Sequence, residues 1–144
     1  MGKVSIVYWS GTGNTEAMAA AMAEGVKDAG AEVELLTVDK AEAAALSEAK
    51  AFALGCPAMG AEELEEGEME PFMAELDSQI AGKTIALFGS YGWGGGEWMC
   101  EWESRVVADG AAVLSGEGII ADNAPDDDVL AECRAAGAKL AALV

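Results

Sequence analysis

The chain has 144 residues, 26 of them acidic and 8 basic, and its formal net charge is −18. Affinity for nucleic acid comes largely from cations that meet phosphates, so this charge balance argues against a nucleic-acid-binding protein and favours encounters with basic partners. The apolar runs are too short for a membrane-spanning helix, and the N-terminal residues lack the apolar stretch of a signal peptide. We therefore expect one domain over residues 1–144 that stays in the cytoplasm.

The cysteines argue against several kinds of reactive centre. Cys56, Cys100 and Cys133 are odd in number and widely spaced, and the chain has no histidine. A zinc site, an iron–sulfur cluster, a CxxC redox pair and a Cys–His nucleophile are therefore poorly supported. We expect reduced thiols, with Cys133 in the core because it falls on the apolar stripe of the last predicted helix.

Short apolar runs predict the strands of a sheet. Several of them are continuous rather than alternating, which is typical of parallel strands buried on both faces. The fifth run is interrupted and is predicted as one broken strand. The predicted strands are Lys3–Tyr8, Glu32–Thr37, Ala51–Leu54, Thr84–Gly89, and Ala112–Leu114 with Ile119–Ile120.

The segments between the strands predict helices, because apolar residues recur at three- or four-residue spacing. In the first segment Met18, Met22 and Val26 share one face, and Gly30 ends the pattern. Pro71 suits the first turn of another helix. The predicted helices are Asn14–Ala29, Ala41–Ser47, Pro71–Gln79, Glu97–Asp109 and Asp126–Leu143.

Alternating strands and helices predict an α/β fold in which helices cover both faces of a parallel sheet. Ligands of such folds sit outside the carboxyl ends of the strands, where the strand order reverses. This rule directs attention to loops 9–15, 55–63 and 90–97. These loops also have the least ordinary composition of the chain.

The first loop, Ser10-Gly11-Thr12-Gly13-Asn14-Thr15, is suited to a phosphate. Glycines let backbone N–H groups approach an anion, hydroxyls and an amide add donors, and a helix begins there. The absence of lysine and arginine fits a permanently bound monophosphate better than a transferable triphosphate. A Walker A sequence is absent, and the GxGxxG dinucleotide pattern fails because Glu16 takes the place of its third glycine. A polar helix-capping turn is the alternative.

The second loop, Gly55-Cys56-Pro57-Ala58-Met59-Gly60-Ala61-Glu62, follows a buried strand. The thioether of Met59 can lie on an aromatic face, Gly60 allows its peptide to rotate, and Glu62 can accept a ring N–H. Taken alone, Met59 is better explained as an ordinary core residue.

The third loop runs from Ser90 to Gly96 and contains Tyr91, Gly92, Trp93 and Gly94. A tryptophan among glycines cannot easily reach the core, and such a residue commonly serves as a stacking platform. A surface tryptophan that packs on its own loop is the alternative. Three unusual loops at three converging strand ends nevertheless favour one shared planar, phosphorylated ligand.

The sequences WSGTGNT, GCPAMGAEE and GSYGWGGGEW, in this order, resemble those of short-chain flavodoxins over the whole chain. The fifth strand lacks the insertion of the long-chain members. The resemblance implies a three-layer α/β/α fold with a five-stranded parallel sheet in the order 2-1-3-4-5. It also implies one bound flavin mononucleotide (FMN) and low-potential transfer of single electrons in the semiquinone/hydroquinone couple, in place of or parallel to ferredoxin. No substrate turnover is expected.

The resemblance also assigns roles to residues. Ser10, Thr12, Asn14 and Thr15 are expected to bind the phosphate, with Gly11 and Gly13 shaping the loop. Met59 and Trp93 are expected on the inner and outer faces of the ring. The other expected contacts are the Gly60 carbonyl with N5–H, Glu62 with N3–H, the backbone of Gly92–Gly94 with the pyrimidine edge, and the flanking residues Pro57, Ala58, Ala61, Ser90 and Tyr91.

The expected partners are redox proteins with basic docking patches, such as ferredoxin- or flavodoxin-type oxidoreductases, and the chain is expected to be a monomer. A quinone or nitro reductase on the same fold is the main alternative, but it needs an exposed ring face and a nicotinamide site. A signalling receiver domain is excluded because the required acidic pair, phosphorylatable aspartate and lysine are replaced by Trp9-Ser10, Gly55-Cys56 and Asp122-Asn123.

Overall fold

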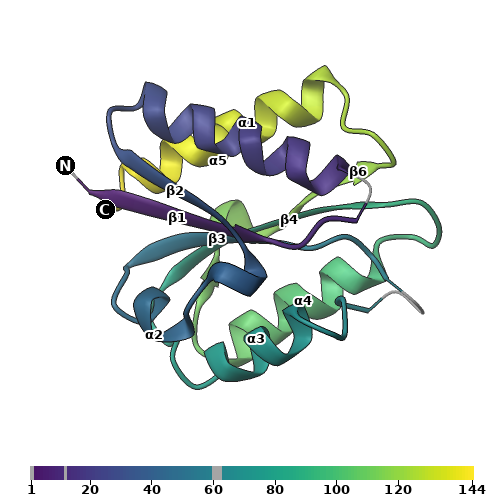
Figure 1. Cartoon of the computed structure of the whole chain (residues 1–144), viewed down its shortest axis with the longest axis horizontal. Coiled ribbons are helices and arrows are strands. Elements are labelled where there is room, and N and C mark those ends of the chain that lie inside the picture. Colours follow the sequence, from purple (N-terminus) through teal and green to yellow (C-terminus); the bar gives the residue numbers. More distant parts are fainter. Residues whose placement is uncertain (1, 12, 60–62) are drawn as a thin grey trace.

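The computed structural model describes residues 2–11, 13–59 and 63–144, and in it a parallel sheet lies between two layers of helices (Figure 1). The strands are β1 (Lys3–Tyr8), β2 (Glu32–Thr37), β3 (Ala51–Gly55), β4 (Thr84–Tyr91), β5 (Ala112–Val113) and β6 (Ile119–Asp122). The helices are α1 (Asn14–Asp28), α2 (Ala43–Leu46), α3 (Met69–Leu76), α4 (Glu97–Ala108) and α5 (Asp127–Ala141). Helices α1 and α5 cover one face of the sheet, and α2, α3 and α4 cover the other.

The strand order is β2-β1-β3-β4-β5, and β6 also pairs with β4. The predicted order 2-1-3-4-5 is therefore confirmed. The interruption of the fifth strand is a 3₁₀ turn at Leu114–Gly116, in which Ser115 has a φ of 63°. The two pieces on either side of this turn, β5 and β6, pair with the beginning and the end of β4 respectively.

Strand β4 is longer than the predicted strand, which ended at Gly89. Ser90 pairs with Ala121, and Tyr91 pairs with Asp122 of β6, so both residues belong to the sheet rather than to the third loop. The loop therefore begins at Gly92. The sequence around Ser90 has no apolar run, and the pairing with β6 extends the strand.

Helices α2 and α3 also differ from their predicted bounds. The predicted helix Ala41–Ser47 is a 3₁₀ turn at Val38–Lys40 followed by the short α2. Helix α3 begins at Met69, two residues before the predicted start, and ends at Leu76 instead of Gln79. Pro71 lies in the first turn, as predicted.

Two hydrophobic cores hold the layers together. One lies between the sheet and the layer of α2, α3 and α4, and includes Phe52, Trp98 and Trp102. The other lies between the sheet and α1 with α5, and includes Met18, Phe88 and the predicted core thiol Cys133. Strand β3 is buried along its whole length, as expected for a central parallel strand. Among the helices in the described parts of the chain, none is long and apolar enough to cross a membrane.

Helices α1 and α5 approach so closely that their backbones touch. A Cβ atom added to Gly137 of α5 would overlap the carbonyl oxygen of Met22, and one added to Gly25 of α1 would overlap the carbonyl oxygen of Arg134. Glycine is needed at both positions because a backbone carbonyl, unlike the end of a flexible side chain, cannot rotate away.

Glu65 determines where α3 begins. Its carboxylate accepts hydrogen bonds from the backbone N–H groups of Gly67 (2.7 Å), Glu68 (2.7 Å) and Met69 (3.0 Å). Burial raises the pKa of the Glu65 carboxyl, but the hydrogen bonds from Met69, Glu68 and Gly67 outweigh this effect and hold the pKa below its ordinary value. An ionised Glu65 therefore stabilises the segment that leads into α3.

We expect Gly137→Ala to lower the free energy of unfolding by about 2 kcal/mol, because the clash with the Met22 carbonyl outweighs the better helix propensity of alanine. Urea denaturation measures this value. Ala138→Ser, at the exposed neighbouring position, should change it by less than about 0.5 kcal/mol. A Gly137→Ala variant as stable as the unmodified protein would show that the two helices can move apart at little cost.

We expect Glu65→Gln to reduce stability at neutral pH by about 1 kcal/mol and to flatten the loss of stability in acid. A carboxyl whose folded-state pKa is depressed stabilises the fold above its unfolded pKa, and this contribution disappears as the pH falls through the folded pKa. Urea denaturation from pH 7 down to below pH 4.5 tests this. Glu66→Gln, on the exposed neighbour, should retain the acid dependence of the unmodified protein, and the same dependence in Glu65→Gln would refute the assignment.

Candidate cofactor site

Three loops meet at the edge where β1, β3 and β4 end (Figure 1). Beyond the strand ends, backbone hydrogen bonds continue between neighbouring segments of the chain. The Trp9 N–H donates to the Gly55 carbonyl (3.0 Å), and the Ala58 N–H donates to the Ser90 carbonyl (3.0 Å). The predicted convergence of the loops after β1, β3 and β4 is thus present, and these bonds set their spacing.

A cavity of about 260 Å³ lies between these loops. Its walls are largely apolar and include an indole from each of two loops, a thioether and a phenol ring. The lining residues are Trp9, Gly11, Asn14, Pro57, Ala58, Met59, Ser90, Tyr91, Gly92, Trp93 and Asn123. All of them except Trp9 and Asn123 were predicted as site residues.

The N-terminus of α1 lies at this cavity, since Gly11 and Asn14 line it. The Ser10 hydroxyl accepts hydrogen bonds from the N–H groups of Gly13 (3.2 Å) and Glu16 (3.3 Å), and Gly13 has a φ of 94°, which favours glycine. The first N–H groups of a helix have no acceptor within the helix, and its dipole is positive at this end. Residues 9–15 contain no lysine or arginine. Thr12, predicted as a phosphate ligand, lies outside the described residues.

Thr15 and Ser90 form a buried polar pair behind the cavity. The Thr15 side chain is only 1% exposed, its hydroxyl lies 3.2 Å from the Ser90 hydroxyl, and it accepts the Ser90 N–H at 3.3 Å. Thr15 therefore connects the first turn of α1 to the end of β4. Ser90 lines the cavity, whereas Thr15 does not.

Met59 forms an antiparallel bridge with Glu63. Its N–H donates to the Glu63 carbonyl (2.9 Å), and the Glu63 N–H donates to the Met59 carbonyl (2.8 Å). The predicted site residues Gly60, Ala61 and Glu62 follow Met59 in the chain and lie outside the described residues. The hydrogen bonds between Met59 and Glu63 fix the two ends of this three-residue segment.

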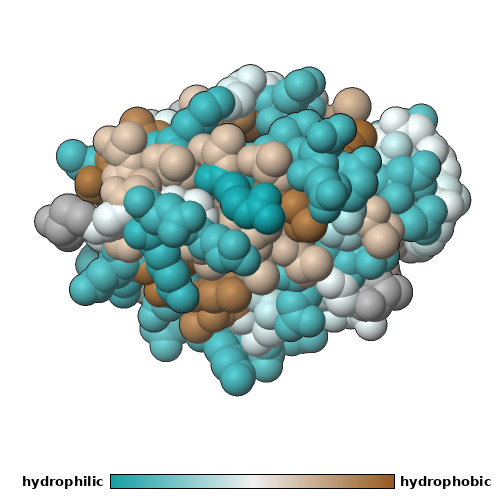
Figure 2. All heavy atoms as spheres, turned by 90° about the horizontal axis from the view of Figure 1, so that it is seen from above, coloured by the Kyte–Doolittle hydropathy of each residue, from teal (hydrophilic) through white to brown (hydrophobic). Residues whose placement is uncertain are grey.

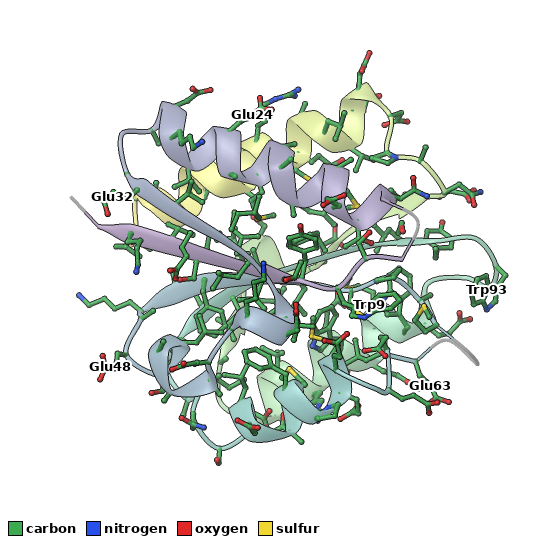
Figure 3. The ribbon with its side chains drawn as sticks, viewed as in Figure 1. Trp9, Glu24, Glu32, Glu48, Glu63 and Trp93 are labelled. Carbon is green, nitrogen blue, oxygen red and sulfur yellow. The ribbon has the colours of Figure 1, made fainter. Side chains whose placement is uncertain are left out.

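Trp93 is 52% exposed on the loop between β4 and α4. The expectation that its side chain stays out of the core is confirmed. Trp9 and Trp93 lie at the same end of the molecule (Figure 3). Gly94, also predicted as a site residue, follows Trp93 with a φ of 75° and does not line the cavity.

Sequence reasoning missed two lining residues, Trp9 and Asn123. The Trp9 ring lies against Gly11, and its Nε1–H donates to a carboxylate oxygen of Glu68 (3.3 Å). Asn123 follows β6 with a φ of 60°, and its N–H donates to the Tyr91 carbonyl (2.7 Å). An indole directly before the first loop was a usable signal for Trp9. Asn123 could not be found this way, because its place in the site depends on the pairing of β6 with β4.

This arrangement fits FMN. An apolar slot with a thioether, indoles and glycines suits a planar ring, and a helix N-terminus with neutral donors suits a phosphate. Within the described ranges, no group of three or more Cys, Asp or Glu side chains could hold a metal ion. The chemistry of the cavity donors matches a phosphorylated aromatic cofactor.

The comparisons with known proteins agree with this chemistry. Residues 6–137 match the Flavodoxin family model. The flavodoxin of Megasphaera elsdenii is 48% identical over 92% of this chain and 98% of its own length, and that of Clostridium beijerinckii is 46% identical over 86% and 89%. The solution structure of two-electron reduced Megasphaera elsdenii flavodoxin superposes with a TM-score of 0.86 at 47% identity, covering 94% of this chain and 98% of that one.

The match begins within β1, ends within α5 and includes the loops that form the cavity. The chain belongs to the flavodoxin family and is an FMN-binding electron-transfer protein rather than an enzyme.

Proposed function

We propose that the cavity holds the flavin ring of FMN and that the N-terminus of α1 holds its phosphate. One observation carries this proposal: a single cavity joins an apolar slot, with Met59 and Trp93 in its walls, to Gly11 and Asn14 at the start of a helix. The phosphate ligands are the backbone N–H groups at this helix start together with the side chains of Ser10, Asn14 and Thr12. Thr15 supports this loop through its contact with Ser90.

Met59 and Trp93 cover the two faces of the ring in this proposal. A thioether and an indole both make favourable contacts with an aromatic face. Tyr91, Asn123 and the Gly92–Gly94 backbone form the edge of the slot. The Gly60 carbonyl and the Glu62 carboxylate are proposed partners of ring N–H groups, from the family resemblance of their sequence.

Bound FMN supplies reversible one-electron chemistry, and the chain controls where that chemistry takes place and at what potential. The half-exposed Trp93 lies at the surface, where a partner protein can approach the ring. The apolar walls limit the contact of the ring with water. No residue of the chain needs to react.

Acidic side chains near the site disfavour negative charge on the cofactor and so make its reduced form a stronger reductant. Several of the acids after Met59 are compensated by local contacts. Glu65 accepts three backbone N–H groups, Glu68 accepts the Trp9 indole, and Glu70 pairs with Arg105 (2.8 Å). The exposed residues Glu63 and Glu66 are therefore the strongest candidates for an effect on the potential.

We further propose that the partners are redox proteins with basic docking patches. The net charge of −18 would steer such proteins toward the chain at low ionic strength. Three unpaired thiols, at Cys56, Cys100 and Cys133, favour a reducing compartment such as the cytoplasm. We propose that the chain acts there as a monomer.

We expect Trp93→Ala to weaken FMN binding about tenfold or more, because stacking on an aromatic side chain contributes about 1–3 kcal/mol per ring. Quenching of flavin fluorescence during titration of the flavin-free protein measures the dissociation constant. The affinity for riboflavin should fall by the same factor, since riboflavin has the same ring without the phosphate. Val107→Ala removes another exposed hydrophobic side chain and should leave both constants unchanged. An unaltered dissociation constant in Trp93→Ala would refute the proposed ring position.

We expect the double variant Glu63→Gln/Glu66→Gln to raise the more negative of the two midpoint potentials by about 30–40 mV, since one charge at about 10 Å in water-like dielectric contributes about 0.4 kcal/mol. Glu32→Gln/Glu48→Gln removes the same charge from the opposite end of the molecule (Figure 3) and should have little effect. Spectroelectrochemical titration measures the potentials, and the shift should shrink at high salt. Equal shifts in both variants would show that net charge alone sets the potential.

A further inference from the structure

The loop that carries Met59 is held at its base by one buried residue, Cys56. The Cys56 side chain is fully buried. Its backbone N–H donates to the Phe88 carbonyl of β4 (3.0 Å), so the residue continues the sheet beyond the end of β3. The chain then turns through Pro57 and Ala58 to Met59.

The thiol of Cys56 contacts both arms of the loop. The S–H group donates to the Pro57 carbonyl (3.4 Å) at the start of the loop, and the sulfur accepts the Glu65 N–H (3.4 Å) at its end. Burial raises the pKa of the thiol to about 12, so the group stays protonated and can donate and accept at once. The two arms of the loop are therefore connected at two places, through the Cys56 thiol and through the hydrogen bonds between Met59 and Glu63.

The carbonyl of Cys56 is fixed from the other side by Trp98 in the first turn of α4. The Trp98 Nε1–H donates to it at 3.0 Å, and both groups are buried. The ring of Trp98 also contacts Tyr91, a lining residue of the cavity, with ring centroids 5.6 Å apart. Gly89 leaves room for this arrangement, since a Cβ atom there would overlap the Cys56 carbonyl oxygen.

We infer that Cys56 and Trp98 are positioning residues for the flavin ring: they hold the base of the 56–65 loop so that Met59 faces the slot before the cofactor binds. The inference rests on the proposed placement of the ring between Met59 and Trp93. If Met59 is already held in place, less conformational entropy is lost when the ligand binds, so the affinity is higher. Neither residue lines the cavity.

Helix α4 provides a matched control for Trp98. Trp102 lies one turn later, has the same 1% exposure, and donates its indole N–H to the sulfur of Met73 in the core (3.3 Å). Trp98→Phe and Trp102→Phe therefore each remove one buried indole N–H and a similar volume. Only the first removes the hydrogen bond to Cys56.

The first arm of the experiment compares these two variants. We expect Trp98→Phe to weaken both FMN and riboflavin about fivefold and to change the visible circular dichroism of the bound flavin. Trp102→Phe should bind both flavins as the unmodified protein does, with the same visible spectrum, even if it unfolds at lower urea concentration. Equal affinities and equal spectra in the two variants would overturn the inference.

The second arm uses the thiol. Cys56→Ala removes the donor and the acceptor together, whereas Cys56→Ser retains both. Cys133→Ala removes another fully buried thiol, from the core between the sheet and α5. We expect a several-fold loss of flavin affinity in Cys56→Ala, recovery to within about twofold in Cys56→Ser, and no loss in Cys133→Ala. A Cys56→Ser variant that binds no better than Cys56→Ala would overturn the role of the thiol.

The unmodified protein gives a readout that does not depend on the folding of any variant. The Glu65 N–H should exchange with solvent deuterium much more slowly than an exposed loop amide, and fast exchange would overturn the inference. Failure of the proposed function is separately visible. The unmodified protein would then not bind FMN, or Trp93→Ala would bind it equally well, whereas failure of the inference alone leaves both results intact.

Discussion

Parallel strands all end at the same edge of their sheet, and the cofactor site depends on this constraint. The hydrogen bonds of the sheet do not stop with the strands: Trp9 bonds to Gly55, Cys56 to Phe88, and Ala58 to Ser90. Each bond fixes the spacing of two loops by backbone atoms alone. The side chains of three distant segments therefore surround one cavity. The neutral phosphate site at the start of α1 belongs to the same arrangement, because Thr15 bonds to the end of β4.

The two sides of the sheet reach their packing in different ways. On one side, α1 and α5 touch through backbone atoms at Gly25 and Gly137, and the outer surface carries hydrophilic side chains interspersed with hydrophobic ones (Figure 2). On the other side, large indoles fill the space below β4, and Arg105 of α4 contacts Glu70 of α3 and Asp77, the residue that follows α3. The second side also contains the loop that carries Met59. The many polar contacts of this loop restrain it, because the loop has few backbone hydrogen bonds to the sheet.

Much of this arrangement could be predicted because local patterns agree with the fold. The alternation of apolar runs and helical stripes predicted the layers, and the composition of three loops predicted the site. The strand order could be predicted only from the family resemblance, since the periodicity of the sequence does not specify which strands pair. The predicted end of β4 was wrong because Ser90 and Tyr91 are held in the sheet by β6 rather than by their own propensity. The start of α3 depends on the Glu65 carboxylate, whose contacts arise only after the loop has turned. Asn123 was not predicted for a similar reason, because its place in the site depends on the pairing of β6 with β4.

The position of Asn123 has a consequence for the order in which the protein can be made. This residue lines the cavity and bonds to Tyr91, yet it comes later in the sequence than every other lining residue, in the segment between β6 and α5. A nascent chain on the ribosome can form β1, β3 and the first loops long before residue 123 is synthesised. It cannot offer the complete cavity until then, so the cofactor is best retained only after residue 123 has been made.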